Sequence, residues 1–320
     1  MTESATTPYL AHDPPGTPAG TFRSLLVPVD LSPASDRVIG RVARLPLAEG
    51  ARLTLLHVIP EGLTLRSQER AENDARKALQ AETEALAREL PGSVAIQHAV
   101  RVGAAAAEIV RHAGAVAADL IVMGRAGGRA LRDLILGSTA ERVVRGARLP
   151  VLVVRLRPRT PYRRPALALA LDDTARDAVI TLLRMIPPPR PAVSVIHACA
   201  APYQELTYSS LPEEDVEACR EERESKAQEE LARTLAAALA EAKVPPDDAP
   251  AWKTRVRHGS PRALIEKAVK KADIDLLALG THGHSGVAHA FLGTVAGDVL
   301  RAVACDVLVV PPREAASQGT

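Results

Sequence analysis

The sequence predicts an α/β protein built from two tandem, open, twisted and mostly parallel five-stranded sheets, each with helices on both faces. Three observations support this prediction. Short apolar segments alternate with segments of helical periodicity along the 320 residues. The apolar segments are hydrophobic at consecutive positions, which is typical of parallel strands buried on both sides. The order of elements then occurs a second time, because Gly124 and Gly137 match Gly280 and Gly293 at one constant interval.

The first copy contains every element of such a unit. Apolar or alternating segments predict strands at 24–30, 51–60, 93–103, 119–124 and 150–156. Helical periodicity predicts helices at 32–48, 66–90 and 104–117, and a further helix that begins near Gly137. Ser32 suits the cap of the first helix and Pro33 suits its first turn.

The second copy repeats this order. Strands are predicted at 166–173, 192–200, 275–280 and 306–311, a long helix at 214–242, and a strand followed by a helix within 252–272. The predicted organisation is a flexible tail at 1–21, a first domain at 22–155, a linker at 156–164, a second domain at 165–312 and a tail at 313–320. The arginines of the linker are interpreted as a solvated connection rather than a nucleic-acid patch.

The composition limits the class of protein. A net charge of +2 and 2% aromatic residues argue against a nucleic-acid partner. No apolar run is long enough to predict a membrane span, and the first residues lack the pattern of a secretory signal. The cysteines Cys199, Cys219 and Cys305 are scattered, so neither a disulfide framework nor a metal site is expected. We therefore expect a protein of the cytoplasm.

Glycines follow the fourth strand of each copy, where a parallel sheet collects its ligands. Gly124 and Gly127 follow one strand, and Gly137 with Ser138 opens the next helix, while Asp30 ends the first strand. Glycines let backbone N–H groups approach a phosphate, and a helix N-terminus favours an anion. The pattern predicts a nucleotide phosphate site, although glycines that only cap strands and helices are the alternative. Neither a P-loop nor a GxGxxG fingerprint is present.

These residues resemble the ATP-binding branch of the universal stress proteins, whose motif is G-x2-G-x9-G-[ST]. The motif is present as Gly124, Gly127, Gly137-Ser138 and again as Gly280, Gly283, Gly293-Thr294. The segments LLVPVDLSPAS, LLHVIP and PVLVV are also similar to strands of the family, and the likeness spans roughly 22–155 and 165–312. The resemblance implies an adenine-nucleotide alpha-hydrolase-like, Rossmann-like fold with strand order 3-2-1-4-5 in each copy.

The resemblance also implies the residues of a nucleotide site in each copy. In the first copy, Asp30 would hold the ribose or adenine side, Val58 would contact adenine through its backbone, and the remaining residues would line the pocket or hold ribose and phosphates: Pro28, Val29, Met123, Gly124, Arg125, Gly127, Gly137, Ser138, Thr139 and Ala140. The matching residues of the second copy are Asp172, Ala198, Leu279, Gly280, Thr281, His282, Gly283, Gly293, Thr294, Val295 and Ala296.

Two positions depart from the family pattern. Ala126 stands where the family often has histidine, and the sequence match places Ala170 where the first copy has Pro28. The histidines at 282, 284 and 289 are interpreted as a phosphate contact or as exposed residues rather than as metal ligands. No metal site on the protein is predicted.

The expected function is a regulatory module that binds ATP, with Mg²⁺ bridging the phosphates, in one or both copies. An adenine nucleotide and an unidentified protein are the expected partners. The last strands of the two copies would pair as an intramolecular pseudo-dimer, with a homodimer of whole chains as a further option. One alternative is a slow ATPase or a protein that phosphorylates itself on Ser138 or Thr294. The other is a partner-binding protein that needs no nucleotide.

Overall fold

The strands of both copies form one continuous ten-stranded sheet. The computed structural model describes residues 21–125, 137–172, 174–199, 213–281 and 293–312. The strand order is β3-β2-β1-β4-β5-β10-β9-β6-β7-β8, so each half has the predicted order 3-2-1-4-5 and the two halves meet at their last strands. The prediction of two separate five-stranded sheets is therefore corrected to one mixed sheet in which most strand pairs are parallel.

The first copy provides five strands and four helices among the described residues. Its strands are β1 (Phe22–Pro28), β2 (Leu47–Ile59), β3 (Ala95–Val102), β4 (Leu120–Gly124) and β5 (Val151–Val154). Its helices are α1 (Ser35–Val42), α2 (Leu65–Glu89), α3 (Ala105–Ala115) and α4 (Ser138–Gly146). All strand pairs within this copy are parallel, as expected for strands joined through helices.

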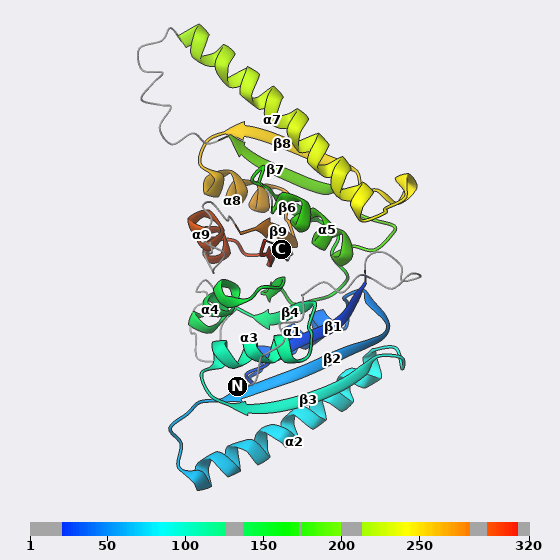
Figure 1. The fold of residues 1–320 in the computed structure, drawn as a ribbon, viewed down its shortest axis with the longest axis vertical. Coiled ribbons are helices and arrows are strands. Elements are labelled where there is room, and N and C mark those ends of the chain that lie inside the picture. Colours follow the sequence, from blue (N-terminus) through cyan, green and yellow to red (C-terminus); the bar gives the residue numbers. More distant parts are fainter. Residues whose placement is uncertain (1–20, 126–136, 173, 200–212, 282–292, 313–320) are drawn as a thin grey trace, which may run out of the picture.

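The second copy repeats this arrangement. Its strands are β6 (Pro165–Ala168), β7 (Val193–Cys199), β8 (Trp252–His258), β9 (Leu276–Gly280) and β10 (Asp306–Val310). Its helices within the described residues are α5 (Ala175–Met185), α7 (Glu213–Glu241), the short 3-10 helix η1 (Pro246–Asp248), α8 (Pro261–Lys271) and α9 (Thr294–Ala302). Figure 1 shows the two copies following one another along the long axis of the molecule, with α2 and α7 near its opposite ends.

Each face of the sheet carries a core that runs through both copies. Successive strand residues point to opposite faces, so Leu25 and Val27 belong to one core while Leu26 belongs to the other. One core is covered by α1, α2, α5 and α7, and the other by α3, α4, α8 and α9. Because both faces are covered, inner strands such as β4, β5 and β9 are apolar throughout, as predicted. The edge strands β3 and β8 instead carry polar side chains among their apolar ones and are less buried.

The two copies join through an antiparallel pair of strands, β5 and β10. Leu152 lies opposite Leu308, with Val151 and Val153 opposite Val309 and Val307. These side chains are buried on both faces, so each strand covers the edge that the other would expose. The predicted pairing of the last strands within one chain is thus observed, and we call this pair the seam.

A buried carboxylate, Asp306, lies at the start of β10 beside the seam. Its Oδ1 accepts hydrogen bonds from the backbone N–H groups of Arg155 at 2.7 Å and Leu156 at 2.8 Å. Its Oδ2 accepts from the Tyr162 hydroxyl at 2.8 Å and lies 3.2 Å from Nε of Arg41 on α1. Burial raises the pKa of the Asp306 carboxyl, and Arg41 and these hydrogen bonds oppose that shift.

The segment 156–164 is more than a solvated linker. Its arginines are exposed, as predicted, but Tyr162 is buried under the guanidinium of Arg41, 4.0 Å from the ring centroid. Arg41 also donates to the carbonyl of Thr160 at 3.0 Å. The segment therefore connects α1 of the first copy to β10 of the second through packed contacts.

Candidate functional site

A cavity of about 250 Å³ opens at the carboxyl ends of β1, β2 and β4 in the first copy. The strand order reverses between β1 and β4, which is where open α/β sheets bind their ligands. The lining residues come from these strand ends and from α1, α3 and α4: Pro28, Val29, Asp30, Ala34, Ser35, Val38, Leu56, His57, Val58, Ala105, Ile109, Met123, Gly124, Arg125, Gly137, Ser138, Thr139 and Ala140. We call this the first-copy cavity.

The first-copy cavity contains all the site residues predicted for this copy that the structure describes. Only Gly127 is missing from the lining, and it lies outside the described residues. The residues come from positions as far apart as Pro28 and Ala140, and the fold brings them to one edge of the sheet.

Asp30 is exposed at the end of β1 and its carboxylate is held in place by hydrogen bonds. Its Oδ1 accepts from the Ser32 hydroxyl at 2.7 Å, the Ser32 amide at 3.1 Å and the Ser35 hydroxyl at 2.8 Å. These donors belong to the turn into α1, so the carboxylate has a fixed position at the mouth of the cavity. A fixed acceptor of this kind suits hydroxyl or amino donors of a ligand.

The N-terminus of α4 forms the opposite end of the cavity. Its N-cap, Gly137, has no side chain to cap the helix, and the first N–H groups, at Ser138, Thr139 and Ala140, have no acceptor within the helix. Gly137 donates to the carbonyl of Arg125 at 2.8 Å, which brings the end of β4 next to the helix. Free N–H groups and the positive end of the helix dipole together favour an anion at this point.

Positive charge adds to this effect. Arg125 lines the cavity, and its charge is close enough to lower the pKa of Arg155, which burial and Arg125 together bring to about 10. Arg125 thus brings positive charge to the cavity. The electrostatics of this end therefore match the geometry of the helix.

His57 also lines the cavity, and it is not among the site residues predicted from the sequence. Its Nδ1 lies 2.9 Å from the carbonyl oxygen of Val29. Because a carbonyl oxygen can only accept, Nδ1 carries the proton, and Nε2 is the acceptor in the neutral ring. The sequence signal that could have identified His57 is its position directly before Val58, a predicted site residue, and two residues after the buried Leu55.

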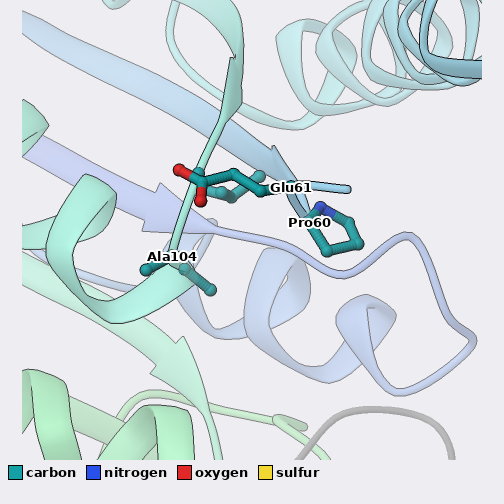
Figure 2. A pocket seen from close by; sticks show the side chains of 6 residues that line it. Pro60, Glu61 and Ala104 are labelled. Atoms are coloured by element: carbon teal, nitrogen blue, oxygen red, sulfur yellow. The ribbon is translucent and has the colours of Figure 1, made fainter. Parts of the chain in front are cut away.

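A second hollow adjoins the first-copy cavity. It has a volume of about 330 Å³ and is lined by Val58, Pro60, Glu61, Gly103, Ala104 and Ala105. Val58 and Ala105 belong to both linings, so the two hollows are neighbours along the end of β2. Figure 2 shows Pro60 and Glu61 after the end of β2 and Ala104 at the start of α3, around this second hollow.

Equivalent backbone hydrogen bonds align the second copy with the first in a register that the sequence match did not give. In the first copy Val29 donates to the carbonyl of Leu56 at 2.9 Å, and in the second copy Leu169 donates to that of Ile196 at 3.1 Å. The next residue up each second strand is a histidine, whose Nδ1 contacts Val29 in one copy and Leu169 in the other. Leu169 therefore occupies the place of Val29.

This register changes the match of the acidic residues. Ala170 follows Leu169 and so stands at the place of Asp30, not at that of Pro28. Asp172, which the sequence match placed opposite Asp30, lies two residues further on, at the place of Ser32. The carboxylate of Asp172 accordingly has a local role, described below.

The other residues predicted for the second copy lie at the expected ends of its elements. Leu279 and Gly280 end β9, Thr281 follows and donates to the carbonyl of Val310 at 3.0 Å, and Ala198 lies in β7. Gly293 is the N-cap of α9, and Thr294, Val295 and Ala296 form its first turn. His282 and Gly283 lie outside the described residues, as do the histidines at 284 and 289. Among the residues that are described, no cluster of histidine, cysteine or carboxylate side chains could hold a metal ion.

The comparisons with known proteins identify the family. The family model described as the universal stress protein family matches residues 21–155 and again residues 159–311. The chain belongs to the universal stress protein family. Its two copies are thus two tandem universal stress protein domains, as the resemblance implied.

Two known universal stress proteins are similar to this chain along nearly its whole length, and a third is similar to less than half of it. One from Mycolicibacterium smegmatis is 27% identical over 310 residues, which is 92% of this chain and 99% of the relative. The crystal structure of one from Archaeoglobus fulgidus superposes with a TM-score of 0.62 at 15% identity, and covers 92% of this chain and 98% of that one. A universal stress protein solved in complex with cAMP is 24% identical over 42% of this chain and 97% of its own, with a TM-score of 0.34.

One negative finding concerns membranes. Within the described ranges, no helix combines the length and the apolar composition needed to cross a bilayer.

Proposed function

We propose that this universal stress protein is a regulatory module that binds ATP in its first-copy cavity. The observation that carries the proposal is the lining of that cavity, where a fixed carboxylate, an uncapped helix N-terminus and small residues lie at one edge of the sheet. Regulation would follow if ATP stabilises one arrangement of the two copies that a protein partner recognises. We further expect the protein to act in the cytoplasm.

The residues suit the parts of the nucleotide in order. Pro28, Val29 and Val58 would enclose the base, with the Val58 backbone at the adenine edge. The carboxylate of Asp30 would accept from ribose hydroxyls or from the base. Phosphates would lie at the start of α4, beside Ser138, Thr139 and Ala140.

The residues present also fit the phosphates of ATP. At Gly124 a Cβ atom would already be in van der Waals contact with Cγ2 of Val38, at 3.4 Å. A branched side chain at this position would therefore occupy space that the glycine leaves open in the cavity lining. Mg²⁺ would accompany ATP as the ion that bridges its phosphates, and it would take its ligands mainly from phosphate and water. Ser138 is placed to contribute a hydroxyl at the phosphate end.

Isothermal titration of the full chain with ATP and Mg²⁺ tests the proposal. We expect saturable binding, and at least a tenfold loss of affinity in Gly124→Val, since the branched side chain enters the cavity. Gly146→Ala is the matched control, because its Cβ would make only an ordinary 3.7 Å contact with Val110 at the far end of α4. Absence of heat and of competition with a fluorescent ATP analogue in the wild type would refute the proposal.

The enzyme alternative is tested with the same protein. Ser138 lines the cavity at the first position of α4, so transfer of the γ-phosphate to its hydroxyl is the reaction to look for. Incubation with γ-labelled ATP should leave the protein unlabelled and release no phosphate if it only binds. Labelling or release that Ser138→Ala removes would favour the enzyme.

A further inference from the structure

We infer that nucleotide binding is confined to the first copy, because the Thr174 side chain closes the equivalent space in the second. This inference rests on the proposed function, and it names the copy that binds and the residue that excludes the ligand from the other. The family motif is present in both copies, so the motif by itself gives no reason for such a difference.

Thr174 and Ala34 occupy the same position of the two copies. Ala34 is the N-cap of α1 with φ −72° and ψ −25°, and Thr174 is the N-cap of α5 with φ −83° and ψ −16°. The next residue, Ser35 in one copy and Ala175 in the other, donates to the carbonyl three residues before it. The backbone conformation at Ala34 and at Thr174 is thus the same, and the two positions differ only in their side chains.

The threonine side chain reaches the glycine that ends the fourth strand of its copy. A Cβ atom built on Gly280 would lie 2.4 Å from Oγ1 and 3.1 Å from Cβ of Thr174. A Cβ atom on Gly124 would find its nearest neighbour, Cγ2 of Val38, at 3.4 Å. Thr174 is only 4% exposed, so its hydroxyl fills the space beside Gly280 that stays hollow beside Gly124.

Asp172 fixes the threonine in this position. Its Oδ1 accepts from the Thr174 hydroxyl at 2.6 Å and from the Thr174 amide at 2.9 Å. A rotation of the threonine away from Gly280 would break the shorter of these bonds, which is a bond to a charged acceptor. The same oxygen of Asp172 therefore holds both the hydroxyl and the amide of Thr174.

The described residues that follow β6 differ from the first copy at one further position. Ala170 stands where the first copy has Asp30, so this position carries no carboxylate in the second copy. The closed space and the missing carboxylate are independent differences, and both remove contacts that the first copy provides. The second copy then serves the first as the partner of its last strand.

The stoichiometry of binding tests this inference on the full chain. Titration with ATP and Mg²⁺, checked by native mass spectrometry, should give one nucleotide per wild-type chain and none in Gly124→Val. Two nucleotides per chain, or one that remains in Gly124→Val, would overturn the inference. If the wild type bound no nucleotide at all, the proposed function would be overturned, and the inference with it. That result differs from the two results above, which overturn the inference alone.

Transfer of the threonine to the first copy tests its role. Ala34→Thr should weaken ATP binding at least tenfold, because Ser32 already accepts from the Ala34 amide at 3.2 Å and would hold the new side chain as Asp172 holds Thr174. Ala81→Thr, the same change at an exposed position of α2, is the control. Thermal unfolding of both variants checks that they fold. Wild-type affinity in a folded Ala34→Thr protein would overturn the role of Thr174.

Discussion

Replacement of Asp306 by alanine should strongly destabilise the junction of the two copies. The side chain is completely buried and accepts from Arg155, Leu156 and Tyr162, with Arg41 as its ion-pair partner. The variant would leave the Arg41 guanidinium, itself 4% exposed, without its counter-charge. Loss of one partner of a buried ion pair costs about 3–5 kcal/mol.

The expected loss can be measured as a change in Tm. In domains of this size one kcal/mol corresponds to roughly 2–4 °C, so Tm should fall by on the order of 10 °C. Differential scanning calorimetry or circular dichroism measures this change. Asp298→Ala is the control, because its pair with Arg301 is exposed on both sides and is worth about 0–1 kcal/mol.

A double variant separates the ion pair from general damage. Arg41→Met combined with Asp306→Leu removes both charges and keeps apolar volume, so it should be less destabilised than Asp306→Ala alone. A folded Asp306→Ala protein whose Tm lies within about 2 °C of the wild type would refute the reasoning. It would mean that the hydrogen bonds described here contribute nothing net to stability.

Three further predictions concern other parts of the chain. Burial, together with Arg101 and Arg111, lowers the pKa of His112, so the unfolded chain takes up its proton first and stability falls as pH drops from about 7 to 5. His112→Gln should reduce this fall in chemical denaturation, and an unchanged pH dependence would contradict the assignment. The second hollow adjoins Val58, where the adenine edge is proposed to lie, so ATP analogues with a bulky N6 substituent should bind with an affinity within about tenfold of that of ATP. Ala104→Trp would fill this hollow, so it should weaken binding of the analogues and leave ATP binding unchanged. Cys305 is buried and its pKa is raised to about 12, so a maleimide should label it last among the cysteines in the native protein.

Much of the fold follows from local patterns. Continuous apolar runs such as 119–124 and a helical period such as that of 66–90 each report on one element, and β4 and α2 lie where these patterns predict. The strand ends are equally local, so Asp30, Gly124 and Ser138 could be assigned to one edge of a sheet. The single sheet was missed because two complete units were assumed, although pairing of their last strands was expected.

The difference between the two copies could not be read from the motif. Asp172 is the acidic residue nearest the end of β6, and a sequence match allows a shift of two residues that only backbone hydrogen bonds resolve. Thr174 is a common N-cap residue and gives no warning that its hydroxyl reaches Gly280 across the sheet edge. Likewise, the role of Tyr162 depends on Asp306, which is far away in sequence.

The antiparallel pair of β5 and β10 has a consequence for the evolution and engineering of this chain. Each half carries one ribbon of backbone donors and acceptors that matches the ribbon of the other half. If the chain were divided between Leu156 and Arg164, each fragment would have one edge strand with unpaired backbone groups, β5 in one and β10 in the other. The two fragments should associate through these strands when they are expressed in the same cell. A half expressed alone would leave its edge strand free to pair with a second copy of the same half. The covalent fusion therefore ensures that β5 pairs with β10 of the same chain.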